Sequence, residues 1–250
     1  MILRRIKAHV ENENWFAVGV DFAIVVIGVF IGLQLGNWNE ARAERAMERQ
    51  YVIQLLDDMQ SSRTMIEGRN QWLAQQVDDQ RSLLDVIEIC EVSPADQAGV
   101  ARALSSLGKY VFAIVDRQLI DQLSASGQFS ILQNIALQEG LNGLTRQSDN
   151  QMRSESLFAA QSVPFVNQAR HFYYFDSDEG VDSDPWETWE NLRFDLEQAC
   201  KDPEFITAIG NTRETTHYLH RWNEQILGQV KALEAILEVE IEARGWRDTP

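Results

Sequence analysis

The sequence contains little cysteine and no close cysteine pair. Cys90 and Cys200 are the two cysteines among its 250 residues, and no CxxC motif is present. A cysteine-based metal site needs several thiolates at short spacing, so the sequence predicts none. In an oxidising compartment the two cysteines would be able to form a disulfide between distant segments. Two buried, unreacted thiols are the other outcome, and the sequence leaves both open.

Motifs of common catalytic sites are also missing. The chain has no G-x-S-x-G sequence, no cysteine and histidine at the spacing of a known enzyme family, and no glycine-rich phosphate loop after a strand. We therefore predict no enzyme activity and no cofactor. Catalytic, cofactor-binding and metal-binding residues are likewise not predicted.

Basic residues are few. Lysine and arginine number 22 against 38 aspartate and glutamate residues, which gives a net charge of −16. Such a chain repels polyanions, so we expect no nucleic-acid partner.

The alternation of apolar and polar residues that marks a strand is missing, except briefly near residues 110–115. Apolar residues instead recur at steps of three, four or seven, which is the spacing of helices. We predict an all-α fold, with an N-terminal transmembrane helix followed by a mostly helical bundle of long helices. The first and last long helices are expected to be antiparallel.

The segments expected to be helical can be bounded by their capping residues. Residues 39–89 are expected to continue the membrane helix. Ser93-Pro94-Ala95-Asp96 and Asp184-Pro185-Trp186-Glu187 have the pattern of helix starts, and so does Asp202-Pro203-Glu204. The expected helices cover 93–108, 116–126, 134–174 with a kink at Pro164, 184–200, a segment from 202, and 212–244.

Long apolar runs are absent except for FAVGVDFAIVVIGVFIGLQL at residues 16–35. A helix of about 20 apolar residues crosses the hydrocarbon core of a bilayer. The run is longer than the apolar core of a cleavable signal peptide, so we interpret it as a permanent anchor. We predict a cytoplasmic tail at 1–15, a transmembrane helix at 16–36 and a helical soluble domain, periplasmic, at 37–250.

Residues that flank the run fit a span but do not fix its direction. Trp15 and Trp38 bracket it as interfacial anchors do. An excess of lysine and arginine marks the cytoplasmic side of a span, but here the two sides have equal numbers. Three precede the run and three follow it: Arg4, Arg5, Lys7, Arg42, Arg45 and Arg49. The preference for a cytoplasmic tail depends on the short tail, the large acidic domain and the resemblance described below.

Two features of the span concern packing and charge. Gly28, Gly32 and Gly36 recur every fourth residue, and such glycines let another helix approach closely. We therefore expect a homo-oligomer, or a membrane-protein partner, on this glycine face. Asp21 lies seven residues before Gly28 and points the same way. It is either an interfacial carboxylate solvated from the cytoplasm or a proton- or cation-handling group in a complex.

Two acidic or histidine patterns predict metal binding only weakly. Residues 176–187 place acids at positions 1, 3, 7, 9 and 12 of an EF-hand-like loop, but Val181 occupies the position that needs glycine. Glu214, His217 and His220 share one helix face, yet a di-iron bundle site needs a second Glu-x-x-His, which the sequence lacks. A solvated loop and an ordinary polar helix face are the simpler interpretations.

The stretch VDFAIVVIGVFIGLQLGNWNEARAE resembles the N-terminal signature of an uncharacterised family of bacterial single-pass membrane-anchored helical proteins. The shared positions are an intramembrane acid, two glycines, a glutamine and an Asn-Trp-Asn-Glu end: Asp21, Gly28, Gly32, Gln34, Asn37, Trp38, Asn39 and Glu40. Segments ERQYVIQLLDDM and SGQFSILQNIALQEGL resemble later parts of that family. Asp21 replaces the usual glutamate, and Val20 the usual preceding glycine. The resemblance implies a single-pass helical membrane protein without a known activity or catalytic residues.

The function that these observations favour is that of a protein-interaction or scaffold component of the bacterial inner membrane. One alternative is a subunit of an ion-coupled membrane complex that uses Asp21. Another is a metal-binding enzyme built on Glu214, His217 and His220. The lipid bilayer is an expected partner in each case.

Overall fold

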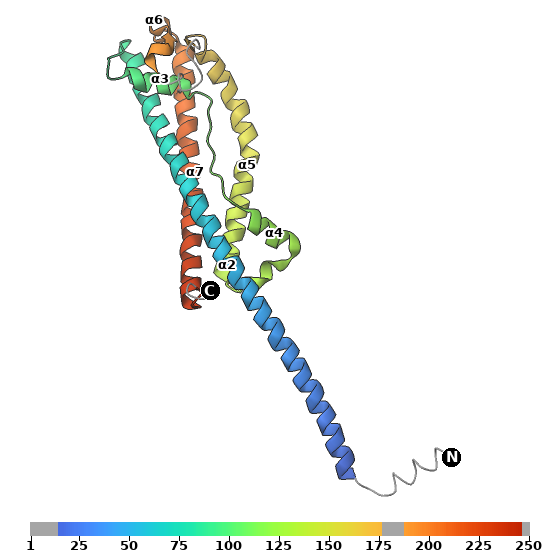
Figure 1. Ribbon diagram of the computed structural model, residues 1–250. Coiled ribbons are helices and arrows are strands. Elements are labelled where there is room, and N and C mark those ends of the chain that lie inside the picture. The colour runs from blue at the N-terminus through green and yellow to red at the C-terminus, as the bar shows by residue number, and fades with distance from the viewer. Residues whose placement is uncertain (1–14, 177–187, 247–250) are drawn as a thin grey trace. The chain divides into compact units, whose positions relative to one another are not determined.

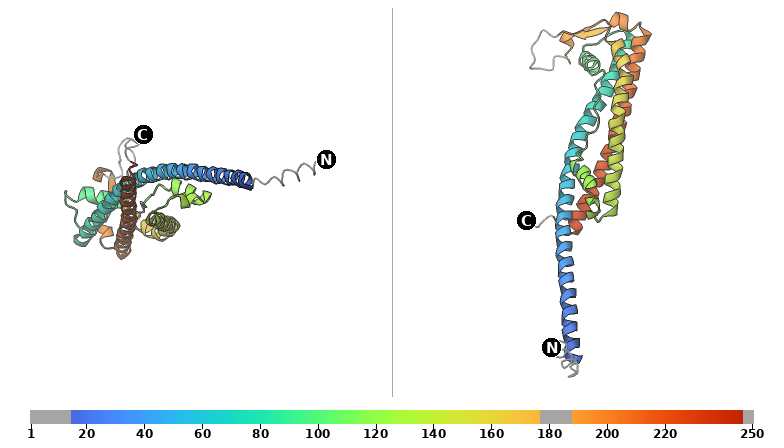
Figure 2. Two further views of the ribbon diagram at one scale, coloured as in Figure 1. Left: turned by 90° about the horizontal axis from the view of Figure 1, so that it is seen from below. Right: turned by 90° about the vertical axis from the view of Figure 1, so that its right-hand side faces the viewer.

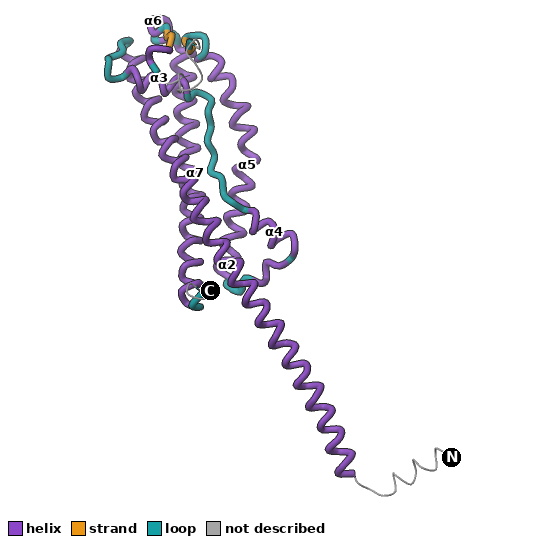
Figure 3. Tube along the Cα trace, in the orientation of Figure 1, coloured by secondary structure: helices purple, strands orange, loops and turns teal. Residues whose placement is uncertain are grey.

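The computed structural model describes residues 15–176 and 188–246. The chain divides into an N-terminal unit, Met1–Gln50, and a C-terminal unit, Tyr51–Pro250. The described residues form six α-helices, two short 3₁₀ turns and two three-residue strands (Figures 1 and 3). The predicted all-α fold is confirmed.

The first helix, α2 (Trp15–Ile89), is 75 residues long and contains the boundary between the two units. Its helical backbone is unbroken from the apolar run into the C-terminal unit, so the prediction that residues 39–89 continue the first helix is confirmed. The predicted span ends at residue 36 and the C-terminal unit begins at Tyr51. Residues 37–50 are therefore helical chain between the predicted span and the packed bundle.

The C-terminal unit is a bundle of three long helices, which lie side by side in all the views (Figures 1 and 2). They are the part of α2 after Gln50, α5 (Ile135–Ala169) and α7 (Pro203–Ala243). Arg63 pairs with Glu234 and Lys231 with Glu67, so residue numbers rise along α2 as they fall along α7. The predicted antiparallel arrangement of these two helices is confirmed.

Helix α5 also runs antiparallel to α7 and approaches it closely. Asn134 at its start donates to Glu240, and Gln147 further along accepts from Gln229. A Cβ atom on Gly140 would lie 2.6 Å from Leu233 Cδ2, so a side chain there would force the buried Leu233 side chain to move.

An extended segment, residues 109–117, takes the place of a fourth long helix, and we call it the strap. It connects α3 (Gln97–Ser105) with α4 (Gln118–Ser126) and follows the bundle lengthwise (Figure 3). Burial alternates along it, with Ala113 and Val115 buried and Ile114 exposed. This accounts for the brief strand-like pattern in the sequence, although the strap is not assigned as a strand.

Three of the predicted helix boundaries near the strap are wrong. Helix α3 begins at Gln97 with Asp96 as its N-cap, four residues after Ser93. The Ser93 hydroxyl donates to Asp96 at 2.6 Å, so these residues form a turn instead of the first turn of a helix. Helix α3 ends at Ser105, before Gly108. Helix α4 begins at Gln118 and ends at Ser126, and Gly127 adopts the left-handed φ of +70° expected of its cap.

Helix α5 begins where the sequence indicates but ends early. The Asn134 side chain accepts from Leu137 N at its start, and Pro164 lies inside the helix without ending it. The helix stops at Ala169, not near Tyr174, because strand β1 (Tyr173–Phe175) pairs antiparallel with β2 (Leu192–Phe194). These strands were not predicted, because three residues are too few to show a strand period.

The predicted helix over residues 184–200 is wrong in its described part. Residues 188–200 contain a 3₁₀ turn (Trp189–Asn191), β2 and the single-turn helix α6 (Leu196–Ala199). The proposed start at Asp184 lies outside the described residues.

The predicted segments from 202 and over 212–244 are one helix, α7. The Asp202 side chain accepts from Phe205 N, and Pro203 occupies the first helical position, as the sequence indicates. No proline follows within α7, so nothing ends the helix before Ala243. Gly245, predicted to cap it, follows with a φ of +63°.

Two apolar clusters lie at opposite ends of the bundle. One joins α2, the strap, α4, α5 and α7 around Leu55, Leu141 and Val230. The other joins the end of α2 with α3, the two strands and the start of α7 around Leu83, Leu104 and Phe205. Between them lie buried polar residues, which include Asn70, Gln76, Asp79, Gln151, Thr216 and Asn223. The core therefore has a polar middle.

Candidate functional site

The apolar run forms the outer surface of the N-terminal unit. Its large apolar side chains from Phe22 to Leu35 are between 49% and 70% exposed. In the described chain this is the one helix long and apolar enough to cross a membrane. An uninterrupted apolar surface is costly in water, so these residues need another apolar environment.

The predicted packing and charge residues lie on this helix. Gly28, Gly32 and Gly36 are uncovered, since no described atom would lie within 4 Å of a Cβ built on any of them. Asp21 and Trp15 belong to α2, and their side chains are outside the described part of the structure. Trp38 is 59% exposed, with the Arg42 guanidinium carbon 5.9 Å from its ring centre. The use of Asp21 in ion coupling stays a prediction.

Cys90 and Cys200, which the sequence left as a disulfide or two thiols, are joined by a disulfide. The bond links residues 110 positions apart and ties the end of α2 to the end of α6. Cys90 has a left-handed φ of +56°, which a side chain with Cβ adopts at a cost of about 1 kcal/mol. A glycine would adopt this left-handed φ without that cost. The disulfide is therefore the reason that we give for a cysteine at this position.

The histidine pattern does not form a metal-binding cluster among the described residues. The described residues contain no group of three or more histidine, cysteine, aspartate or glutamate side chains placed to hold a metal. Glu214 and His217 instead line a cavity of about 550 Å³ between α2 and α7, together with Arg81 and Arg213. Most of the 176–187 loop lies outside the described residues, so its calcium hypothesis is not addressed.

The polar middle of the bundle holds the strap through side chains of α7 and α2, and a residue of α5 contacts one of them. Asn223 on α7 is fully buried, and its amide donates to Val111 O at 3.0 Å and accepts from Ala113 N at 2.9 Å. The Gln151 amide, from α5, lies 2.8 Å from Asn223 Oδ1. These contacts replace the backbone partners that an isolated extended segment lacks.

Helix α2 holds the strap at two further points. Ser62 Oγ accepts from Asp116 N at 2.9 Å, and Arg69 donates to Phe112 O at 2.6 Å. Sequence analysis did not find these residues. The sequence does contain one signal, which is that polar residues such as Ser62 and Asn223 occupy core positions of helices. A buried polar side chain needs a hydrogen-bond partner, and here the partner is the strap backbone.

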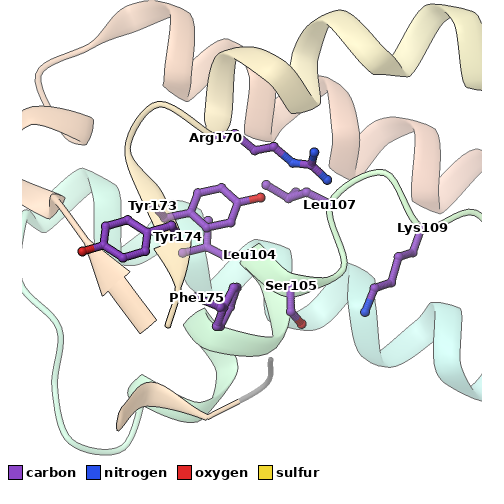
Figure 4. Close-up of a pocket in the computed structure, with 8 residues that line it drawn as sticks. All are labelled: Leu104, Ser105, Leu107, Lys109, Arg170, Tyr173, Tyr174 and Phe175. Atoms are coloured by element: carbon purple, nitrogen blue, oxygen red, sulfur yellow. The ribbon is translucent and has the colours of Figure 1, made fainter. Parts of the chain in front are cut away.

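A cavity of about 550 Å³ opens beside the second apolar cluster, and we call it the aromatic pocket (Figure 4). Its residues come from the end of α3, the start of the strap, the end of α5 and β1. They are Leu104, Ser105, Leu107, Lys109, Arg170, Tyr173, Tyr174 and Phe175. The volume suits a drug-sized small molecule, which pockets of about 300–1,000 Å³ enclose.

The wall of the aromatic pocket is apolar and largely buried. Leu104 and Leu107 are buried, and the Tyr173 ring packs edge-on to Phe175 with the ring centres 6.1 Å apart. Burial raises the pKa of Tyr173 to about 12, while the nearby Arg170 guanidinium acts in the opposite direction. The Tyr173 hydroxyl is therefore neutral at physiological pH. Tyr174 is 64% exposed at the mouth.

The charge of the aromatic pocket contrasts with that of the chain. Lys109 and Arg170 are both exposed, and none of the described residues that line the pocket carries a carboxylate. Neither cation forms an ion pair with a described acidic residue. The cavity along the strap, of about 420 Å³, contains Asp121 and Glu155 beside its arginines. Among the described residues, the lining of the aromatic pocket therefore carries positive charge without a neighbouring carboxylate, in a protein whose net charge is −16.

Sequence analysis did not predict the aromatic pocket. Its residues are spread over positions 104–175 and come together only because the α5 end and β1 pack beside α3. No family model, curated protein or solved structure matches this chain. The fold and sites described above are therefore the basis for assigning a function.

Proposed function

We propose that this protein is a single-pass component of the bacterial inner membrane that acts through protein contacts, with its helical bundle in the periplasm. The observation that carries the proposal is the apolar surface from Phe22 to Leu35. Fourteen residues of helix rise about 21 Å, and the predicted span over 16–36 rises about 31 Å, which matches the hydrocarbon core.

The direction of the span is supported by the disulfide. Disulfides persist in oxidising compartments and are rare in the cytosol. The basic residues on the two sides of the span are equal in number and leave its direction open. The Cys90–Cys200 bond lies in the C-terminal unit, and it therefore favours export of that unit. The assignment to bacteria and to the inner membrane depends on the sequence resemblance.

The occupant that we propose for the glycine face is a second copy of the chain. Nothing in the described chain covers Gly28, Gly32 or Gly36, and glycines at this spacing allow two helix backbones to meet. An identical helix presents the same face, so a two-fold pair needs no other partner.

Alkaline extraction and protease protection test the proposal together. Full-length protein should stay with the membrane at high pH. In cells whose outer membrane has been permeabilised, added protease should degrade residues 51–250 while the inner membrane stays sealed. Recovery of full-length protein in the soluble fraction would reject the anchor. A protease-resistant bundle that becomes sensitive only after lysis of the inner membrane would reject its direction.

A further inference from the structure

We infer that the aromatic pocket binds a small amphipathic anion, namely an apolar ring or short acyl body that carries one carboxylate. This inference does not depend on the membrane proposal, because every residue of the pocket belongs to the C-terminal unit.

The apolar part of the ligand is indicated by the wall of the pocket. Leu104 and Leu107 are at most 4% exposed, and the Tyr173 ring closes the wall beside them. A hydrocarbon body placed against these groups would lose its contact with water, at a gain of about 25 cal/mol per Å² of apolar surface buried. Tyr174 and Phe175 supply aromatic surface on which a flat ring would stack.

The anionic group is indicated by Lys109 and Arg170. In Figure 4 their charged ends lie on the same side of the two tyrosine rings. Arginine offers a planar fork that matches a carboxylate, and lysine supplies a second positive charge. Ser105 adds a hydroxyl to the lining. Because no described residue of the lining carries a carboxylate, a bound anion would not compete with one of them for Lys109 or Arg170.

Alternative occupants fit less well. A cation would meet two like charges, and a fully apolar molecule would leave both charges unused. An inorganic anion would use the charges but not the apolar wall. The combination of both surfaces in about 550 Å³ therefore favours a molecule that has both parts.

Isothermal titration calorimetry with 2-naphthoate tests the inference on the full chain in lipid nanodiscs, with empty nanodiscs subtracted. We expect saturable binding of one molecule per chain. The uncharged analogue 2-naphthylmethanol and the small anion acetate should each bind at least tenfold more weakly. The double variant Lys109→Gln, Arg170→Gln should lose at least tenfold in affinity for 2-naphthoate.

Lys201→Gln is the matched control, because Lys201 is 69% exposed and pairs with Glu197 outside the pocket. Its affinity should equal that of the wild type. If circular dichroism shows that the double variant is unfolded, Lys109→Gln alone decides, since Lys109 is exposed and should still weaken binding severalfold. Absence of binding, equal affinity for 2-naphthylmethanol, or unchanged affinity in the folded charge variant would overturn the inference. Tighter binding of an apolar tripeptide with an amidated end would also overturn it, in favour of a protein-docking groove.

Discussion

The two units of this protein distribute polar and apolar side chains in opposite ways. In the N-terminal unit, apolar residues such as Ile27 and Phe30 are more than half exposed. In the C-terminal unit, polar residues such as Asn223 and Asp79 are almost completely buried. Each arrangement is unfavourable by itself, since exposed apolar surface and unpaired buried polar groups both cost free energy. The difference shows that each unit needs a different surrounding: the N-terminal unit needs an apolar environment, for which we propose lipid, and the buried polar groups need the strap backbone or a charged side chain.

The largest expected effect comes from placing charge in the apolar run. Val26→Arg with Phe30→Arg should cost about 5–7 kcal/mol, because arginine at the centre of a span costs about 2.5–3.5 kcal/mol on insertion scales. Alkaline extraction should move this variant from the membrane pellet to the supernatant. Val26→Leu with Phe30→Leu is the matched control and should remain in the pellet. Retention of the arginine variant would count against a span.

Loss of the disulfide should come next. Cys90→Ser with Cys200→Ser should lower the free energy of unfolding of the C-terminal unit by about 2–5 kcal/mol, since the bond closes a loop of 110 residues. Urea denaturation followed by circular dichroism measures this. Cys90→Gly with Cys200→Ser should be about 1 kcal/mol more stable than the serine pair, because glycine removes the cost of the left-handed backbone at Cys90. Equal stability of all three proteins would contradict the account.

The polar middle can be broken at Asn223. Asn223→Ala should lower the free energy of unfolding by about 3 kcal/mol, because it leaves Val111 O and Ala113 N without their partner in a buried site. Amide exchange should increase along the strap. Asn211→Ala, on the same helix and only partly buried, is the control and should cost less than about 0.5 kcal/mol. Similar losses for the two variants would mean that the strap does not depend on this side chain.

A smaller effect is expected at the ion pair between the buried Asp79 and the partly exposed Arg102. Two nitrogens of Arg102 donate to Asp79 at 2.7 and 2.9 Å, and the Asp79 side chain is 5% exposed. Asp79→Asn keeps the shape but removes the charge, so we expect a loss of about 1–2 kcal/mol. The same substitution at Asp121, whose side chain is 56% exposed, should have little effect by thermal unfolding. A larger loss of stability from the Asp121 substitution than from the Asp79 substitution would contradict the idea that burial determines the contribution of an ion pair.

Replacement of the glycines should change association and leave folding unaltered. Gly28→Leu with Gly32→Leu should reduce self-association in a membrane reporter assay at least tenfold, because the side chains hold the helix backbones apart. Both positions are open in the single chain, so the packed unit should keep its stability. Val26→Leu with Phe30→Leu, on the opposite face, should associate as the wild type does. Unchanged association of the glycine variant would discard the second-copy proposal.

Most of the helical organisation was predictable, because it depends on local patterns. The apolar periodicity of α2 and α7 and the capping residues Asn134 and Asp202 are visible in the sequence. The predicted boundaries were wrong where contact with a segment distant in the sequence determines the structure. The α5 end depends on Leu192–Phe194, which lies 17 or more positions beyond Phe175 and pairs with β1.

The sites divide in the same way. The apolar run and its glycines are contiguous and were identified directly. The strap contacts of Asn223 and the aromatic pocket combine residues from several helices, so no spacing rule reveals them. The disulfide is intermediate, because the sequence offered the two cysteines but no geometry to decide between a bond and two thiols.

Photocrosslinking from within the apolar run tests the central claim most directly. The photoreactive residue p-benzoylphenylalanine would replace Phe30 in full-length protein in native membranes, and Phe194 in a control protein. Irradiation should join phospholipid acyl chains to the Phe30 position, detected by mass spectrometry, and none to the Phe194 position. Phe30 adducts with protein or solvent alone, with no lipid, would contradict the account.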